Sequence, residues 1–180
     1  KGIIHIHDMD YGANDMFNCD LVNLQDMLDN GTVINKKKIN SPHTLKTAMT
    51  VATQISAQVA SFQYGGQTMS LSHLAPYVRK SKEVIEKEVE LDYPELPQER
   101  KDKIVDRKLK KEIKDSVQLF NYQISTIQST NGQAPFLSVA MYLGETEEYK
   151  EELAMIIEEF LKQRILGFKN EKGVYITPAF

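Results

Sequence analysis

The side chain best suited to chemistry in this sequence is its single cysteine, Cys19. One cysteine cannot form a disulfide within the chain, and it cannot build a cysteine-rich zinc site. Such a thiol either packs as a small hydrophobic group or is kept for chemistry beside polar partners. Asn18 and Asp20 flank it directly. The residues alone leave both roles open, and the polar neighbours favour the chemical one.

Two histidines, His5 and His7, precede the cysteine on an apolar segment. Side chains two residues apart lie on the same face of a β-strand, so both imidazoles would point to one side. With Asp8 and Asp10 they would offer the nitrogen and oxygen ligands that transition metals bind. Acid–base chemistry, substrate binding or a structural role fit the same residues. We assign His7 to catalysis, His5 to substrate binding, and no residue to a metal.

Two glycine-containing segments, 63–67 and 130–133, lie where helices are expected to end. Glycine lets backbone amides approach a ligand closely, although a helix stop followed by a turn would use the same residues. Neither segment has the Gly-x-x-x-x-Gly-Lys pattern of a phosphate loop. The residues that we assign to substrate contact are Gln63, Gly65, Gly66, Asn131 and Gly132.

The composition excludes several classes of protein. Across 180 residues, 41% are hydrophobic and 26% are charged, which is typical of a soluble globular chain. A net charge of −3 gives no field for holding nucleic acid nonspecifically. No apolar run approaches the roughly 20 residues of a membrane span. One cysteine and seven methionines suit a reducing compartment, so we expect a cytoplasmic protein without a nucleic-acid or membrane partner.

The apolar pattern and the Gly and Pro positions predict a helix-rich α/β fold. Helices separate the strands, and strands separated in this way pair in parallel. Three strands cannot close a barrel, so the chain would supply only part of one. The expected strands cover 2–7, 136–143 and 174–180, and the expected helices cover 21–28, 41–62, 71–91, 99–128 and 147–166.

Local signals set several boundaries of these elements. Ser41 and Pro42 would cap and open the helix at 41–62. The proline-containing stretch 93–97 would link the next two helices. His43 and His73 fall in helical surroundings, so we expect them to be structural or surface residues.

Four stretches, in order along the chain, resemble the catalytic subunit of the anaerobic (class III) ribonucleoside-triphosphate reductases. They are Ile4-His5-Ile6-His7-Asp8-Met9-Asp10-Tyr11 with Asn18-Cys19, Ser61-Phe62-Gln63-Tyr64-Gly65-Gly66-Gln67 with Leu74-Ala75-Pro76-Tyr77, Ser129-Thr130-Asn131-Gly132-Gln133-Ala134-Pro135-Phe136, and Thr177-Pro178-Ala179-Phe180. Each stretch is weak alone, but together they span the chain. The resemblance implies an internal fragment, 1–180, of a ten-stranded α/β barrel built from two five-stranded halves.

The resemblance also implies a chemistry. The family makes deoxyribonucleotides for DNA synthesis from ribonucleoside triphosphates by glycyl and thiyl radical chemistry, with formate as the usual reductant. Asn18-Cys19 matches the family's Asn-Cys pair. This match implies that Cys19 donates a hydrogen atom to the substrate radical and that Asn18 bonds a ribose hydroxyl. Some relatives carry two adjacent cysteines here, whereas this chain has Cys19-Asp20.

Further parts of the family's machinery would lie outside these residues. They are the thiyl-radical cysteine, the glycyl radical and the structural zinc, so the isolated fragment would be inactive and would hold no cofactor. The family implies an iron–sulfur, S-adenosylmethionine-dependent activating enzyme, a homodimer, and deoxynucleotide or ATP effectors. The helical region at about 41–128 would serve dimerisation and effector binding. Gln54 and Gln58, four residues apart on one helix face, are the effector candidates, and exposed glutamines on a close-packed helix are the alternative.

Two other functions fit the sequence. One is another glycyl-radical enzyme of the same barrel type. The other is a non-catalytic helical interaction module that uses the charged segment Lys82–Lys114 as its contact surface.

Overall fold

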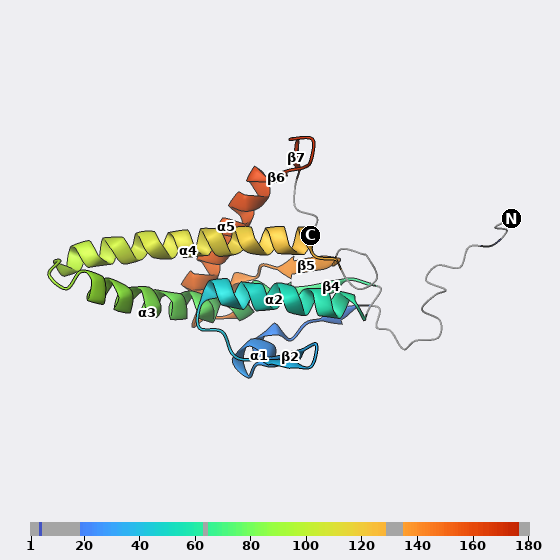
Figure 1. Cartoon of the computed structure of the whole chain (residues 1–180), viewed down its shortest axis with the longest axis horizontal. Helices are drawn as coiled ribbons and strands as arrows, with labels where there is room; N and C mark the ends of the chain where they lie inside the picture. Colours follow the sequence, from blue (N-terminus) through green and yellow to red (C-terminus); the bar gives the residue numbers. More distant parts are fainter. Residues whose placement is uncertain (1–3, 5–18, 63–64, 129–134, 177–180) are drawn as a thin grey trace.

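The computed structural model describes residue 4 and residues 19–62, 65–128 and 135–176. Helices dominate this part of the chain, and short strands lie between them (Figure 1). The prediction of a helix-rich α/β fold is therefore confirmed. The α-helices are α1 (Leu24–Asp29), α2 (Leu45–Ala60), α3 (Ala75–Asp92), α4 (Gln98–Thr126) and α5 (Lys150–Leu166), with the 3-10 helices η2 (Leu71–Leu74) and η3 (Leu143–Glu145).

The described residues form one parallel sheet of three strands, in the order β1-β4-β5. These strands are β1 (Asp20–Leu21), β4 (Gln67–Ser70) and β5 (Leu137–Ala140). Asp20 pairs with Gln67, and Gln67 pairs with Leu137. Two antiparallel hairpins stand apart from this sheet. They join β2 (Thr32–Ile34) to β3 (Lys37–Ile39) and β6 (Phe168–Lys169) to β7 (Tyr175–Ile176).

Helices α3 and α4 form a long hairpin that extends away from the sheet (Figure 1). The stripe along α4 that includes Val105, Leu109 and Ile113 is buried, as the spacing predicted. Near the tip of the hairpin, the buried Lys101 reaches Glu90 at 2.7 Å and the Pro94 carbonyl at 3.2 Å. The charged half of α4 is thus anchored to α3 along its apolar side.

The core surrounds α4, which packs against α2, α3 and α5. The rings of Phe120 on α4 and Phe160 on α5 are fully buried and pack edge to face, with centroids 5.4 Å apart. One turn further along α4, Oε1 of Gln123 accepts a hydrogen bond from the buried Thr53 of α2 at 2.6 Å. Aromatic pairs of this geometry contribute about 0.5–1.5 kcal/mol beyond their buried area.

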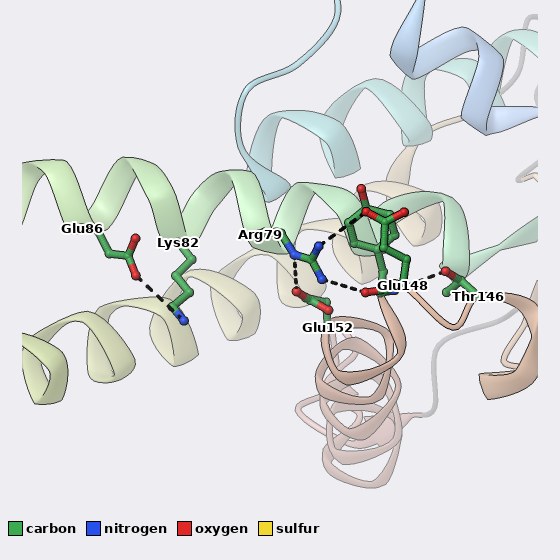
Figure 2. A network of polar contacts seen from close by, with 7 residues as sticks. Arg79, Lys82, Glu86, Thr146, Glu148 and Glu152 are labelled. Atoms are coloured by element: carbon green, nitrogen blue, oxygen red, sulfur yellow. Dashed lines mark hydrogen bonds and ion pairs between the residues drawn. The ribbon is translucent and has the colours of Figure 1, made fainter.

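Arg79 joins α3 to the start of α5 (Figure 2). Its Nε donates to Glu152 at 2.7 Å, and one terminal nitrogen donates to the Glu148 carbonyl at 2.7 Å. The guanidinium also lies over the Tyr149 ring, 4.4 Å from its centroid. Burial raises the pKa of Glu152, but the hydrogen bond from Arg79, a backbone hydrogen bond and the positive charges of Arg79 and Lys82 together outweigh it, so the net pKa is lowered. One side chain thus fixes the entry of the last helix.

The structure corrects several boundaries. Helix α2 begins at Leu45 and Thr44 caps it by accepting from the Thr47 N–H at 3.3 Å, so the prediction of a Ser41 cap with Pro42 at the first helical position is wrong. The helix expected from residue 21 begins at Leu24, because Asp20–Leu21 pairs as a strand.

The strand predictions were right in part. The strand expected at 136–143 is present as β5 and pairs in parallel, as predicted. Of the strand expected at 174–180, the described residues Tyr175–Ile176 pair antiparallel with β6 instead, because Gly173 turns the chain back in a tight hairpin with φ +74°. The strand expected at 2–7 lies outside the described residues. None of the described helices is long and apolar enough to cross a membrane.

Candidate active site at the amino edge of the parallel sheet

Cys19, Gly66 and Phe136 form one row across the sheet. Each directly precedes one of the three paired residues Asp20, Gln67 and Leu137. The backbone ties the row together, because the Asp20 N–H donates to the Gly66 carbonyl at 3.1 Å and the Gln67 N–H donates to the Phe136 carbonyl at 2.9 Å. Parallel strands begin at the same edge, so these three residues mark the amino edge of the sheet.

The face of the sheet that carries this row is open in the described part of the chain. Side chains alternate between the two faces of a strand. Gln67 and Leu137 are buried against the helices, and Gln67 Nε2 donates to the Ser56 carbonyl of α2 at 2.9 Å. The side chains that alternate with these buried ones along the strands point to the opposite face and are exposed. Leu21 is 85% exposed and Phe136 is 74% exposed. Parallel sheets are normally covered on both faces, so an open face of this kind is a candidate binding surface.

The Cys19 thiol is exposed and is not in a disulfide. It lies on the strand next to Gly66, with its side chain on the open face by the alternation of the pleat. Packing is therefore a poor account of this cysteine within the described residues. Its position at a solvent-accessible strand edge suits a group that reacts with a ligand.

Gly66 leaves room for the Phe136 ring. A Cβ built at Gly66 would lie 2.9 Å from Cδ1 of the Phe136 ring, closer than real Cβ contacts come. The ring thus leans over β4, towards the strand that carries Cys19. The sequence offered only a weak signal for this residue, namely an aromatic side chain that directly follows Pro135 at the start of a strand.

The structure therefore brings together the substrate-contact candidates Gly65 and Gly66 and the catalytic candidate Cys19. The candidates that lie outside the described residues are His5, His7, Asn18, Gln63, Asn131 and Gly132.

The effector candidates Gln54 and Gln58 lie elsewhere, in a separate groove of about 610 Å³. The β2–β3 hairpin, the second half of α2 and the end of α4 form its walls. Polar groups from Asn35, Lys37 and Gln128 share the groove with the exposed Phe62 ring. The groove has the volume of a typical small-molecule site.

A second polar cluster lies at the carboxyl ends of the strands. Ser70, the last residue of β4, hydrogen-bonds Ser72 and Glu145. His73, which we expected to be structural or at the surface, is half-buried there, and its buried Nδ1 has no hydrogen-bond partner among the described residues. Burial lowers the pKa of His73, while Glu145 and Asp29 act in the opposite direction.

Asp29 also accepts a hydrogen bond from the Tyr77 hydroxyl at 3.0 Å, and burial is the main reason that the pKa of Tyr77 is raised to about 12. Within the described ranges, no three His, Cys, Asp or Glu side chains are placed to hold a metal ion. Neither edge of the sheet therefore offers a metal site in that part of the chain.

Comparisons with known proteins agree along the whole chain. The sequence profile of the anaerobic ribonucleoside-triphosphate reductases matches residues 1–180. The anaerobic ribonucleoside-triphosphate reductase of Haemophilus influenzae is 38% identical over 185 residues, which cover 100% of this chain and 24% of that protein. The enzyme of the same name from Enterobacteria phage T4 is 36% identical, covering 100% of this chain and 28% of that protein. The chain thus spans about a quarter of the length of these curated relatives.

A solved structure supports the fold. The crystal structure of the anaerobic ribonucleotide reductase from Thermotoga maritima, in complex with dATP and CTP, has a TM-score of 0.61 and covers 89% of this chain and 28% of that one. At 16% sequence identity, this likeness concerns the fold alone. The profile match and the curated relatives decide the family: the chain belongs to the anaerobic ribonucleoside-triphosphate reductases.

Proposed function

We propose that this chain is a segment of an enzyme that converts ribonucleoside triphosphates to deoxyribonucleoside triphosphates by radical chemistry, and that Cys19 donates a hydrogen atom in that reaction. The observation that carries the proposal is the row at the amino edge. There the parallel register sets the exposed Cys19 beside Gly66 on the neighbouring strand, with Phe136 at the start of the third strand. Residues chosen from separate stretches of sequence thus meet around one open surface.

The role of Cys19 follows from the strength of its S–H bond. A carbon-centred radical on the ribose takes the hydrogen atom from Sγ, so a C–H bond forms, the S–H bond breaks and the unpaired electron passes to sulfur. Formate supplies the two electrons that the overall reduction needs. In the overall reaction, ribonucleotide, formate and a proton are converted to deoxyribonucleotide, carbon dioxide and water. A serine could not replace Cys19, because its O–H bond is too strong to yield a hydrogen atom to carbon.

This chain cannot perform the reaction alone. It holds one cysteine, so the cysteine that starts the reaction as a thiyl radical must come from another part of the longer polypeptide. The glycyl radical and the structural zinc would lie there too, and an iron–sulfur, S-adenosylmethionine-dependent enzyme would install the radical. The proposal therefore concerns a cytoplasmic, dimeric parent enzyme and assigns no activity to the isolated 180 residues.

Regulation would act through the groove that holds Gln54 and Gln58. Its volume of about 610 Å³, its amide groups and the ammonium of Lys37 suit a deoxynucleotide or ATP effector. The Thermotoga maritima relative was crystallised with a deoxynucleoside triphosphate and a ribonucleoside triphosphate together, which supports separate sites for two such ligands.

The test uses the full-length parent, activated anaerobically and supplied with formate and CTP. We expect wild type to form deoxynucleotide, and we expect Cys19→Ala and Cys19→Ser to lose turnover while the glycyl radical signal persists. Ser138→Ala is the matched control, because Ser138 is exposed on the same face of the sheet but carries no thiol. Undiminished turnover in both Cys19 variants would reject the role of Cys19. A normal radical signal without any turnover by wild type, with each of the four ribonucleotides, would instead favour another glycyl-radical enzyme.

A further inference from the structure

Phe136 carries an exposed aromatic ring at the amino edge of the parallel sheet. Its ring is 74% exposed, although phenylalanine is normally among the more buried residue types. The sheet nevertheless fixes its backbone, because its carbonyl accepts from the Gln67 N–H at 2.9 Å and the next residue, Leu137, is buried in the core. The ring therefore stands on a rigid base and presents its apolar surface to the open face.

The position of the ring depends on its neighbour. The missing side chain at Gly66 leaves the space that the ring occupies, with a built Cβ only 2.9 Å from Cδ1 and 3.2 Å from Cε1. Adjacent strands lie about 4.8 Å apart, so the ring over β4 is about one strand spacing from the strand of Cys19. The Phe136 ring and the Cys19 thiol thus lie next to each other on one face of the sheet.

We propose that Phe136 is a substrate-positioning residue, whose ring stacks on the nucleobase of the ribonucleotide and so holds the ribose against Cys19. This inference rests on the proposed function and adds a residue that recognises the base. A nucleobase presents a flat π-face of the kind that stacks on aromatic side chains, whichever base it is. The ribose is joined directly to that base, so a base seated on the ring leaves the sugar beside the neighbouring thiol.

The geometry also explains why glycine is needed at position 66. A side chain there would push the ring outwards from the row, and the stacking platform would move away from Cys19. Gly66→Ala should therefore reproduce part of the defect of a Phe136 variant without touching the aromatic ring itself.

The experiment compares Phe136→Leu, Phe136→Tyr and Gly66→Ala in the full-length parent, activated as above, with CTP and each of the other three ribonucleoside triphosphates. Loss of one base-stacking contact predicts that KM rises about 5- to 150-fold for Phe136→Leu, and that binding of nucleotide to the unactivated protein weakens by a similar factor. Phe136→Tyr keeps the π-face and should restore KM to within about threefold of wild type. Tyr142→Leu is the control, since Tyr142 is 68% exposed and lies beyond the other end of β5.

The outcomes separate this inference from the proposed function. A raised KM in Phe136→Leu, rescued by tyrosine and absent from Tyr142→Leu, supports it. An unchanged KM and nucleotide affinity in Phe136→Leu overturns it while leaving the role of Cys19 intact. A fall in kcat with KM and affinity unchanged also overturns it, because the ring would then act elsewhere than in binding. Failure of wild type itself to reduce any nucleotide rejects the proposed function instead.

Discussion

The fold lowers the pKa of His73, a side chain that ordinarily titrates near neutral pH. It lies in η2, the 3-10 turn that follows β4, at the opposite edge of the sheet from Cys19. Its buried Nδ1 lacks a partner among the described groups. Burial lowers its pKa below the ordinary value of 6.5, although Glu145 and Asp29 favour the charged form. The native state therefore resists taking up a proton that the unfolded chain binds readily.

This shift predicts a pH dependence of stability. Because the folded pKa is depressed below 6.5, the contribution of neutral His73 is fully present above pH 6.5 and is lost as the pH falls from 6.5 through the folded pKa. Urea unfolding at a series of pH values should show wild type losing stability between pH 7 and 5 faster than His73→Gln. The comparison between the two proteins cancels the carboxylates that titrate in both. Parallel stability curves for them would show that His73 does not titrate in this window.

At the scale of elements, the sequence predicted the long helices well and the sheet poorly. The spacing of Val105, Leu109 and Ile113 needs no tertiary context to indicate α4, and the buried stripe confirms it. Strand β4 consists of Gln67-Thr68-Met69-Ser70, which has one β-branched residue and no alternation of apolar and polar types, so only its pairing with β1 and β5 makes it a strand. Leu161 on α5 is 49% exposed, because no other described element covers that side of the helix.

Some residues of the candidate site are suggested by residue type alone, whereas others are evident only in the folded structure. Residue types alone made Cys19 and the glycines candidates, because thiol chemistry and close backbone approach depend on local identity. Phe136 could not be chosen from sequence, since its exposure and its contact with Gly66 exist only once β4 and β5 are paired. Gln54 and Gln58 do share one groove, as their spacing on α2 implied, but its other walls come from the β2–β3 hairpin and from α4.

The groove makes a prediction at this scale. Gln58→Glu places a negative charge in a cavity that, as proposed, receives the phosphates of an effector. In solvent-exposed surroundings a like charge at about 4 Å costs about 1 kcal/mol, which corresponds to about fivefold weaker effector affinity. Binding of dATP or ATP to the full-length protein, measured by equilibrium dialysis, checks this. Gln118→Glu on the middle of α4 adds the same charge outside the groove and should leave affinity unchanged. Equal affinities for wild type and Gln58→Glu would place effector binding elsewhere.

At the scale of the whole molecule, the described helices cover one face of the parallel sheet and leave the other bare. Leu21 and Phe136 are the largest apolar side chains on that bare face, at 85% and 74% exposure. An exposed apolar surface on a short, open sheet promotes association with other chains. In the parent protein we expect the remaining polypeptide to enclose this face together with the bound substrate, so that Leu21 packs against protein while the Phe136 ring stays open to the nucleobase.

The 180-residue chain produced alone should therefore self-associate through this face. Sedimentation equilibrium of wild type is expected to show oligomers, and Leu21→Lys should shift the population towards monomer. Leu91→Lys is a closely matched control, because Leu91 is 82% exposed but lies at the far end of α3. Association that Leu91→Lys reduces as strongly as Leu21→Lys would move the contact to the helical hairpin.

The register of the sheet also fixes the spacing of Cys19, Gly66 and Phe136, while the length of the chain that connects their strands is free to vary. Between β1 and β4 the chain passes through α1, a hairpin and α2, whereas between β4 and β5 it passes through η2 and the much longer α3–α4 hairpin. Both routes return to the same row, because ladder hydrogen bonds set the spacing of Cys19, Gly66 and Phe136 whatever the path between them. Whole helical turns gained or lost near residues 93–97 would leave that spacing unchanged. Evolution is thus free to lengthen or shorten the hairpin, while a single-residue insertion beside the row would put the thiol and the ring on opposite faces.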